Sequence, residues 1–163
     1  MRISLFHMLL VICLIIFADY VSKLFLISYM TNVSGFQEMT SFFNLVMVWN
    51  QGVSFGMFQL PQSWGPLFWT GLSILFILFL FVWAVQSSSK FFQIMVALII
   101  GGAIGNVIDR IQYGAVADFF DFHLFGYHWP AFNVADIAIF CGACLIILNQ
   151  LFFNSTSFFK SHS

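Results

Sequence analysis

Apolar residues fall into four long runs along the chain. The runs cover residues 3–28, 66–86, 91–111 and 133–153. Crossing the hydrocarbon core of a bilayer takes roughly 20 predominantly apolar residues, with a range of about 17 to 25. A helix also satisfies its backbone hydrogen bonds internally, which lipid requires. The pattern therefore predicts four transmembrane helices in one integral-membrane domain, residues 1–163.

The segment between the first two runs, residues 29–65, has a different pattern and is too long for a simple hairpin connection. Residues 42–49 are rich in strand-forming side chains, and Asn50-Gln51-Gly52 supplies turn chemistry. Residues 53–58 could return as a second strand. We therefore expect an otherwise all-α membrane fold with a small β-sheet between its first two helices.

Basic residues set the expected orientation in the membrane. Arg2, Lys90 and Lys160 fall at the N-terminus, in the loop between the second and third runs, and at the C-terminus. Lys and Arg are enriched on the cytoplasmic side of membrane proteins. With four spans these three points share one side, so we expect both termini inside (N-in/C-in) and the β segment outside, on the extracytoplasmic face.

Composition excludes an ordinary soluble domain. The chain is 61% hydrophobic and 7% charged, with a mean hydropathy of +0.99, whereas soluble domains carry about 25% charged residues. A net charge of −1 gives no electrostatic basis for binding nucleic acid.

Small residues in the runs indicate close helix packing. Gly101 and Gly105 have the G-x-x-x-G spacing that lets another backbone approach a membrane helix. Cys141 and Cys144 have a C-x-x-C spacing, which could indicate a redox or metal pair. In the middle of an apolar helix we expect them to serve as small packing residues, without a disulfide.

The few charged residues are unevenly distributed. The chain has five Lys or Arg and six Asp or Glu, and residues 105–123 hold Asp109, Arg110, Asp118 and Asp121. A charge at the centre of a membrane helix costs roughly 2.5–3.5 kcal/mol on the insertion scale, so such residues are functional candidates.

Asp19 and Lys23, in the first run, lie four residues apart on one helical face and can form an ion pair. This pair either braces the first helix or takes part in a functional site. Arg110 has a structural alternative as well, because at the end of the third helix it could simply contact lipid headgroups.

Asn133 and Asp136 lie where the fourth helix begins. Asn133 is a good N-cap, and Asp136 would complete something like a capping box. A helix start explains Asn133 fully and Asp136 in part. It does not explain why Asp118 and Asp121 lie at the same membrane depth in the preceding loop. If Asp118 and Asp136 meet, they share a proton. One can then activate water while the other donates to a carbonyl oxygen, without a metal. The helix N-terminus favours the charge on Asp136.

Other kinds of site remain open. His123 and His128 could join the acids as metal ligands, although no ligand spacing recurs and an interfacial role is the simpler interpretation. A small proton- or ion-coupled transporter is the main alternative function, and a structural membrane protein is another.

Five segments, in order, resemble the bacterial lipoprotein signal peptidases (signal peptidase II). They are D-Y-V-S-K at 19–23, F-N-L-V-M-V-W-N-Q-G-V-S-F-G at 43–56, G-G-A-I-G-N-V-I-D-R at 101–110, G-A-V-A-D-F at 114–119 and F-N-V-A-D at 132–136. Tyr20, Trp49 and Ile137 depart from the residues this family often has.

The resemblance implies an aspartyl endopeptidase without cofactor or metal. It would remove signal peptides from diacylglyceryl prolipoproteins, before the lipid-modified cysteine, in the bacterial cytoplasmic (inner) membrane. It implies Asp118 and Asp136 as the catalytic pair, with Asp121 outside it. The residues implied to bind substrate or support the site are Asp19, Lys23, Asn50, Gly52, Asn106, Asp109, Arg110, Asn133 and Ala135. The expected partners are prolipoprotein substrates and membrane lipid, and we expect a monomer.

Overall fold

The computed structural model describes residues 5–52, 60–61 and 63–152. Its elements are α1 (Leu5–Asn32), β1 (Phe36–Thr40), β2 (Phe43–Asn50), α2 (Gly65–Gln86), α3 (Lys90–Tyr113), β3 (Val116–Leu124), β4 (Tyr127–His128) and α4 (Val134–Phe152).

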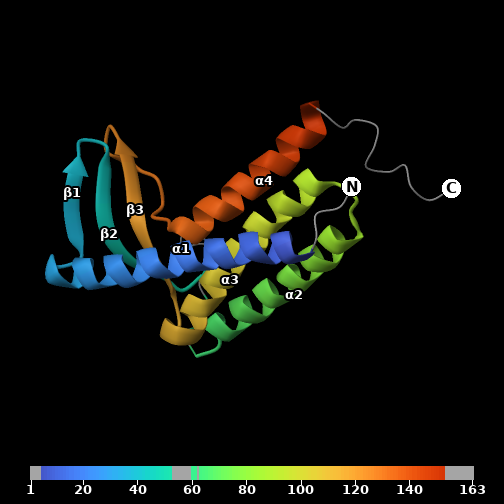
Figure 1. Ribbon diagram of the computed structural model, residues 1–163. Helices are drawn as coiled ribbons and strands as arrows, with labels where there is room; N and C mark the ends of the chain where they lie inside the picture. The colour runs from blue at the N-terminus through green and yellow to red at the C-terminus, as the bar shows by residue number, and fades with distance from the viewer. Residues whose placement is uncertain (1–4, 53–59, 62, 153–163) are drawn as a thin grey trace.

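All four predicted helices are present, and each is long and apolar enough to cross a membrane. Helix α3 is the central one. In its most apolar stretch of 18 residues, 72% of the residues are buried, whereas the corresponding share is 17–22% in the other three helices. Figure 1 shows the start of α1, the end of α4 and the α2–α3 connection at one end of the bundle, and the sheet at the other. Helix α1 continues past the predicted end at residue 28 to Asn32, beneath the sheet.

Local chemistry sets the helix ends. A proline lies in the first turn of α2, where its missing N–H costs nothing. The Ser89 side chain accepts a hydrogen bond from the Phe92 amide at the start of α3. Gly114 ends α3 in the left-handed region, with φ of 71°. This turn sends the chain directly into β3.

The predicted close approach of helices to α3 is confirmed. A side chain at Gly101 would collide with Ile15 of α1, and one at Gly102 would collide with the backbone carbonyl of Ala135 in α4. Glycine thus lets both helices lie against α3. Cys141 and Cys144 are free thiols on α4.

The sheet corrects two predictions from the sequence. The predicted small sheet is present and antiparallel, with the order β1-β2-β3-β4, but half of it comes from the α3–α4 connection and not only from the segment between the first two helices. Residues 116–124, which we expected in a loop, form β3. The strand predicted at 42–49 is confirmed as β2, whereas the one predicted at 53–58 lies outside the described residues.

Apolar packing attaches the sheet to the end of α1. Leu26 and Met30 of α1 are buried against Leu45 of β2 and against Ala117 and Phe119 of β3. Asp118 lies between the last two on the strand. The packing therefore fixes the position of Asp118 at the end of the bundle.

Candidate active site

Five polar residues from separate elements meet where β3 passes the start of α4. Asp118 lies on β3, Asp136 in the first turn of α4 and Asn133 just before that helix. Asn50 ends β2, and Asn106 comes from α3. Sequence reasoning selected all five, and the structure brings them together.

Asn133 connects the two carboxylates. Its side-chain amide donates to Asp118 Oδ1 at 2.7 Å, and its backbone N–H donates to Asp136 Oδ2 at 3.2 Å. The Asp136 backbone N–H donates in return to Asn133 Oδ1 at 2.9 Å. This reciprocal pair is the predicted capping box, and the cap also contacts Asp118.

The two remaining carboxylate oxygens also accept from side-chain amides. Asn50 Nδ2 donates to Asp118 Oδ2 at 3.1 Å, and Asn106 Nδ2 donates to Asp136 Oδ1 at 2.9 Å. Asn133 Nδ2 further lies 3.2 Å from Asn106 Oδ1 and joins the two halves. All four oxygens are therefore oriented by N–H donors.

Asp118 is poised to hold a proton near neutral pH. Burial is the largest effect on it, followed by the charge of Asp136, and together they raise the pKa of Asp118 to about 7. Hydrogen bonds from Asn50 and Asn133 and the charge of Lys23 act in the opposite direction. Two nearby carboxyl groups of this kind can divide acid and base roles between them.

Arg110 contacts the backbone after β2, which the sequence did not distinguish from a simple position among lipid headgroups. Its guanidinium donates to the Gly52 carbonyl at 3.1 Å and to the Asn106 carbonyl at 3.4 Å. The Gly52 N–H donates to Asn50 Oδ1 at 3.1 Å. Since Asn50 in turn orients Asp118, Arg110 and Gly52 hold one side of the site in place.

Three further charged residues form a cluster that contacts the backbone next to both acids. Lys23 Nζ is 2.7 Å from Asp19 Oδ2 and 2.8 Å from Asp109 Oδ2, and all three side chains are buried. Asp19 Oδ1 accepts from the Ala135 N–H at 2.9 Å, and Asp109 Oδ2 accepts from the Ala117 N–H at 3.0 Å.

Ala135 precedes Asp136 and Ala117 precedes Asp118, so this cluster positions both acids through their neighbours. We call Asp19, Lys23 and Asp109 the lysine brace. Gly105 makes room for it, because a side chain there would meet the Asp19 carboxylate. The brace connects α1, α3, β3 and α4, which is more than a neutralised pair within α1.

Asp121 belongs to a different face of β3. It lies three residues from Asp118, and side chains alternate along a strand. Asn44 donates to it at 2.9 Å, and His128 Nδ1 lies 2.8 Å from it. Sequence reasoning missed Asn44, although an amide within an apolar strand was a signal. Among the described residues, no three His, Cys, Asp or Glu are grouped as a metal would require.

The three departures from the family pattern lie at the margin of the site. Tyr20 and Ile137 are exposed on their helices. Trp49 packs on Tyr113, with ring centroids 5.2 Å apart.

Four apolar helices, an adjoining sheet and two carboxylates bridged by Asn133, of which Asp118 is buried and Asp136 partly buried, define a membrane protein with a candidate acid–base site. The family model described as signal peptidase (SPase) II matches residues 11–152. The chain therefore belongs to the signal peptidase II family and is an aspartic peptidase. The transporter alternative gains no support.

Individual relatives support the same family assignment. A lipoprotein signal peptidase of Ralstonia nicotianae is 51% identical over 117 residues, which cover 71% of this chain and 67% of that protein. One of Burkholderia multivorans is 43% identical over 140 residues, covering 85% and 83%. A bacterial membrane enzyme solved by the in meso method at 2.3 Å resolution superposes with a TM-score of 0.77 and 27% identity, covering 99% and 98%.

Proposed function

We propose that this protein removes the signal peptide from diacylglyceryl-modified prolipoproteins, cutting before the lipid-modified cysteine with a water molecule activated by Asp118 and Asp136. The observation that carries the proposal is the bridge made by Asn133, which donates to both carboxylates. The names of the relatives, lipoprotein signal peptidases, support the substrate class.

The two acids divide the work. Asp136, at the N-terminus of α4, is ionised and takes a proton from the attacking water, because the helix end favours a negative charge there. Asp118 is protonated and donates to the oxygen of the scissile carbonyl, consistent with its raised pKa of about 7. The tetrahedral intermediate then collapses when Asp136 returns its proton to the departing amine and Asp118 recovers its own.

The surrounding elements suit a substrate anchored in lipid. The signal helix would lie in the bilayer beside α1 to α4, and its extended end would reach the carboxylates at the sheet end of the bundle. We propose that this end faces outward from the bacterial cytoplasmic (inner) membrane, with both termini inside. Support for that orientation comes from the basic residues Arg2, Lys90 and Lys160.

The substrate is tested by comparing two forms of one prolipoprotein, with and without diacylglycerol on the cysteine, in detergent. Mass spectrometry should find a product that begins at the lipid-modified cysteine, and little product from the unmodified form. Equal cleavage of both forms, or a cut elsewhere, would contradict the proposed specificity.

A further inference from the structure

The turn between β3 and β4 has an unusual residue. Its two central residues, Phe125 and Gly126, have φ of 50° and 81°, and the flanking Leu124 and Tyr127 are paired. Two-residue hairpin turns of this conformation favour Asn or Gly in both positions. A phenylalanine with positive φ is an outlier. The residue is 92% exposed, so no packing within the described residues holds it there.

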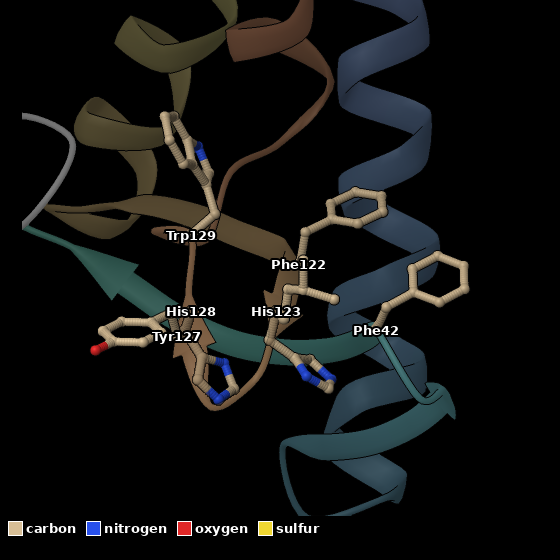
Figure 2. A pocket seen from close by; sticks show the side chains of 7 residues that line it. Phe42, Phe122, His123, Tyr127, His128 and Trp129 are labelled. Atoms are coloured by element: carbon tan, nitrogen blue, oxygen red, sulfur yellow. The ribbon is translucent and has the colours of Figure 1, made fainter.

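Phe125 is part of a larger aromatic surface at the tip of the sheet. We call Phe42, Phe122, Leu124, Phe125, Tyr127 and Trp129 the hairpin surface; every member is exposed, Tyr127 by 84%. Figure 2 shows Phe42, Phe122, Tyr127 and Trp129 together with His123 and His128. These residues and Leu124 line an open cavity of about 490 Å³. Phe42, from the β1–β2 turn, stacks on Phe122 with ring centroids 6.5 Å apart.

The surface also lacks charge. Residues 122–135, which include the hairpin tip and the return to α4, hold no Lys, Arg, Asp or Glu. His128 pairs with Asp121 at the base of the hairpin. A partner that recognised this surface by ion pairs would find few groups to bind, whereas an apolar medium with a polar boundary suits Tyr and Trp well.

The position of the hairpin places it near lipid. It connects the end of α3 to the start of α4, two helices that can cross a membrane. Trp129 lies five residues before Val134, which limits the backbone between them to about 17 Å.

We propose that the hairpin surface inserts into the headgroup and upper acyl region of the adjoining leaflet, so that the lipid bilayer is its partner. Insertion does not depend on the peptidase activity. Its consequence does rest on the proposed function: Asp118 lies on the same strand, six residues before Leu124, so an anchored tip sets its depth at the membrane surface.

Quenching of Trp129 by brominated lipid tests the insertion. The protein is placed in phosphatidylcholine nanodiscs with or without bromine at acyl carbons 6 and 7. The difference between wild type and Trp129→Phe isolates the emission of Trp129. This emission should lose most of its intensity in the brominated discs, and Phe125→Ser should restore much of it. Phe36→Ser, which removes an exposed ring from β1 at the opposite edge of the sheet, is the matched control and should leave the quenching unchanged.

The opposite pattern would overturn the proposal. Emission from Trp129 that is unaffected by brominated lipid but quenched by aqueous iodide would place the hairpin surface in water. Protection from iodide that develops only when a prolipoprotein is added would assign the surface to the substrate peptide and not to lipid.

A cleavage assay tests the consequence separately. Phe125→Ser with Tyr127→Ser should cleave prolipoprotein as wild type does in detergent but several-fold more slowly in vesicles. If the double variant cleaves as fast as wild type in vesicles as well as in detergent, insertion is not linked to the position of Asp118. Quenching with no cleavage by wild type would leave insertion standing and reject the proposed function.

Discussion

Asp118 is held between opposing influences. Burial and the charge of Asp136 favour its protonated form, and amide hydrogen bonds from Asn50 and Asn133 favour its charged form. Burial prevails and raises the pKa to about 7. Between the ordinary value of 3.8 and about 7, the folded protein therefore binds one proton more at Asp118 than the unfolded chain does. Its contribution to the free energy of unfolding falls as pH rises through that window.

Activity should follow the same proton. If Asp118 must be protonated to donate to the carbonyl oxygen, kcat/KM falls as pH rises through about 7, and by about tenfold for each further unit. A pH profile with prolipoprotein, in a detergent whose charge does not change with pH, measures this. An activity that holds constant from pH 6 to about 9 would show that the proton on Asp118 is not used.

At the scale of elements, the lysine brace ties four segments to one ammonium group. Lys23→Met leaves Asp19 and Asp109 buried with no counter-charge. Removing one partner of a buried ion pair typically costs about 3–5 kcal/mol. We expect a large drop in the melting temperature in detergent, together with loss of cleavage.

Lys90→Met is the matched control for the brace, because Lys90 is exposed at the start of α3. It should melt within a degree or two of wild type, as exposed substitutions typically change stability by less than about 0.5 kcal/mol. A Lys23→Met protein as stable as this control would show that the brace does not hold the elements together.

Helix spacing should also govern activity. In Gly102→Ala the added methyl group meets the carbonyl of Ala135, which forces α4 and its Asp136 away from α3. Overpacking of this kind costs typically about 1–3 kcal/mol, and we expect cleavage to fall by more than stability alone explains. In Gly71→Ala on α2 the added methyl group meets nothing within 4 Å, so this variant should keep the stability and cleavage activity of wild type. Equal activities of the two variants would contradict a requirement for close α3–α4 packing.

For the whole molecule, the sequence predicted the helices far better than the sheet. Long apolar runs have few interpretations in lipid, so the spans were found within a few residues. Strand β3 was missed because Asp118 and Asp121 interrupt its apolar pattern, and Asp is rare in strands. Its pairing with β2 joins residues more than 60 positions apart, for which no local pattern gives a signal.

For the candidate site, the sequence predicted which residues take part but not how they contact one another. Scarcity of charge selected the residues, since each charged group near lipid needs a reason. Which group contacts which could not be predicted: Ala135 and Ala117 enter only through backbone N–H groups that bind the brace. Asn44 was overlooked because its partner Asp121 lies on another strand.

The measurement that tests the central claim most directly compares cleavage by wild type, Asp118→Asn and Asp136→Asn in detergent, with a chelator present. Asp121→Asn, an acid removed from the other face of the same strand, is the matched control. We predict that both variants of the pair lose activity by at least about a thousandfold while remaining folded, as removal of a catalytic group typically does, and that Asp121→Asn stays close to wild type. Substantial cleavage by either Asp118→Asn or Asp136→Asn would contradict the account.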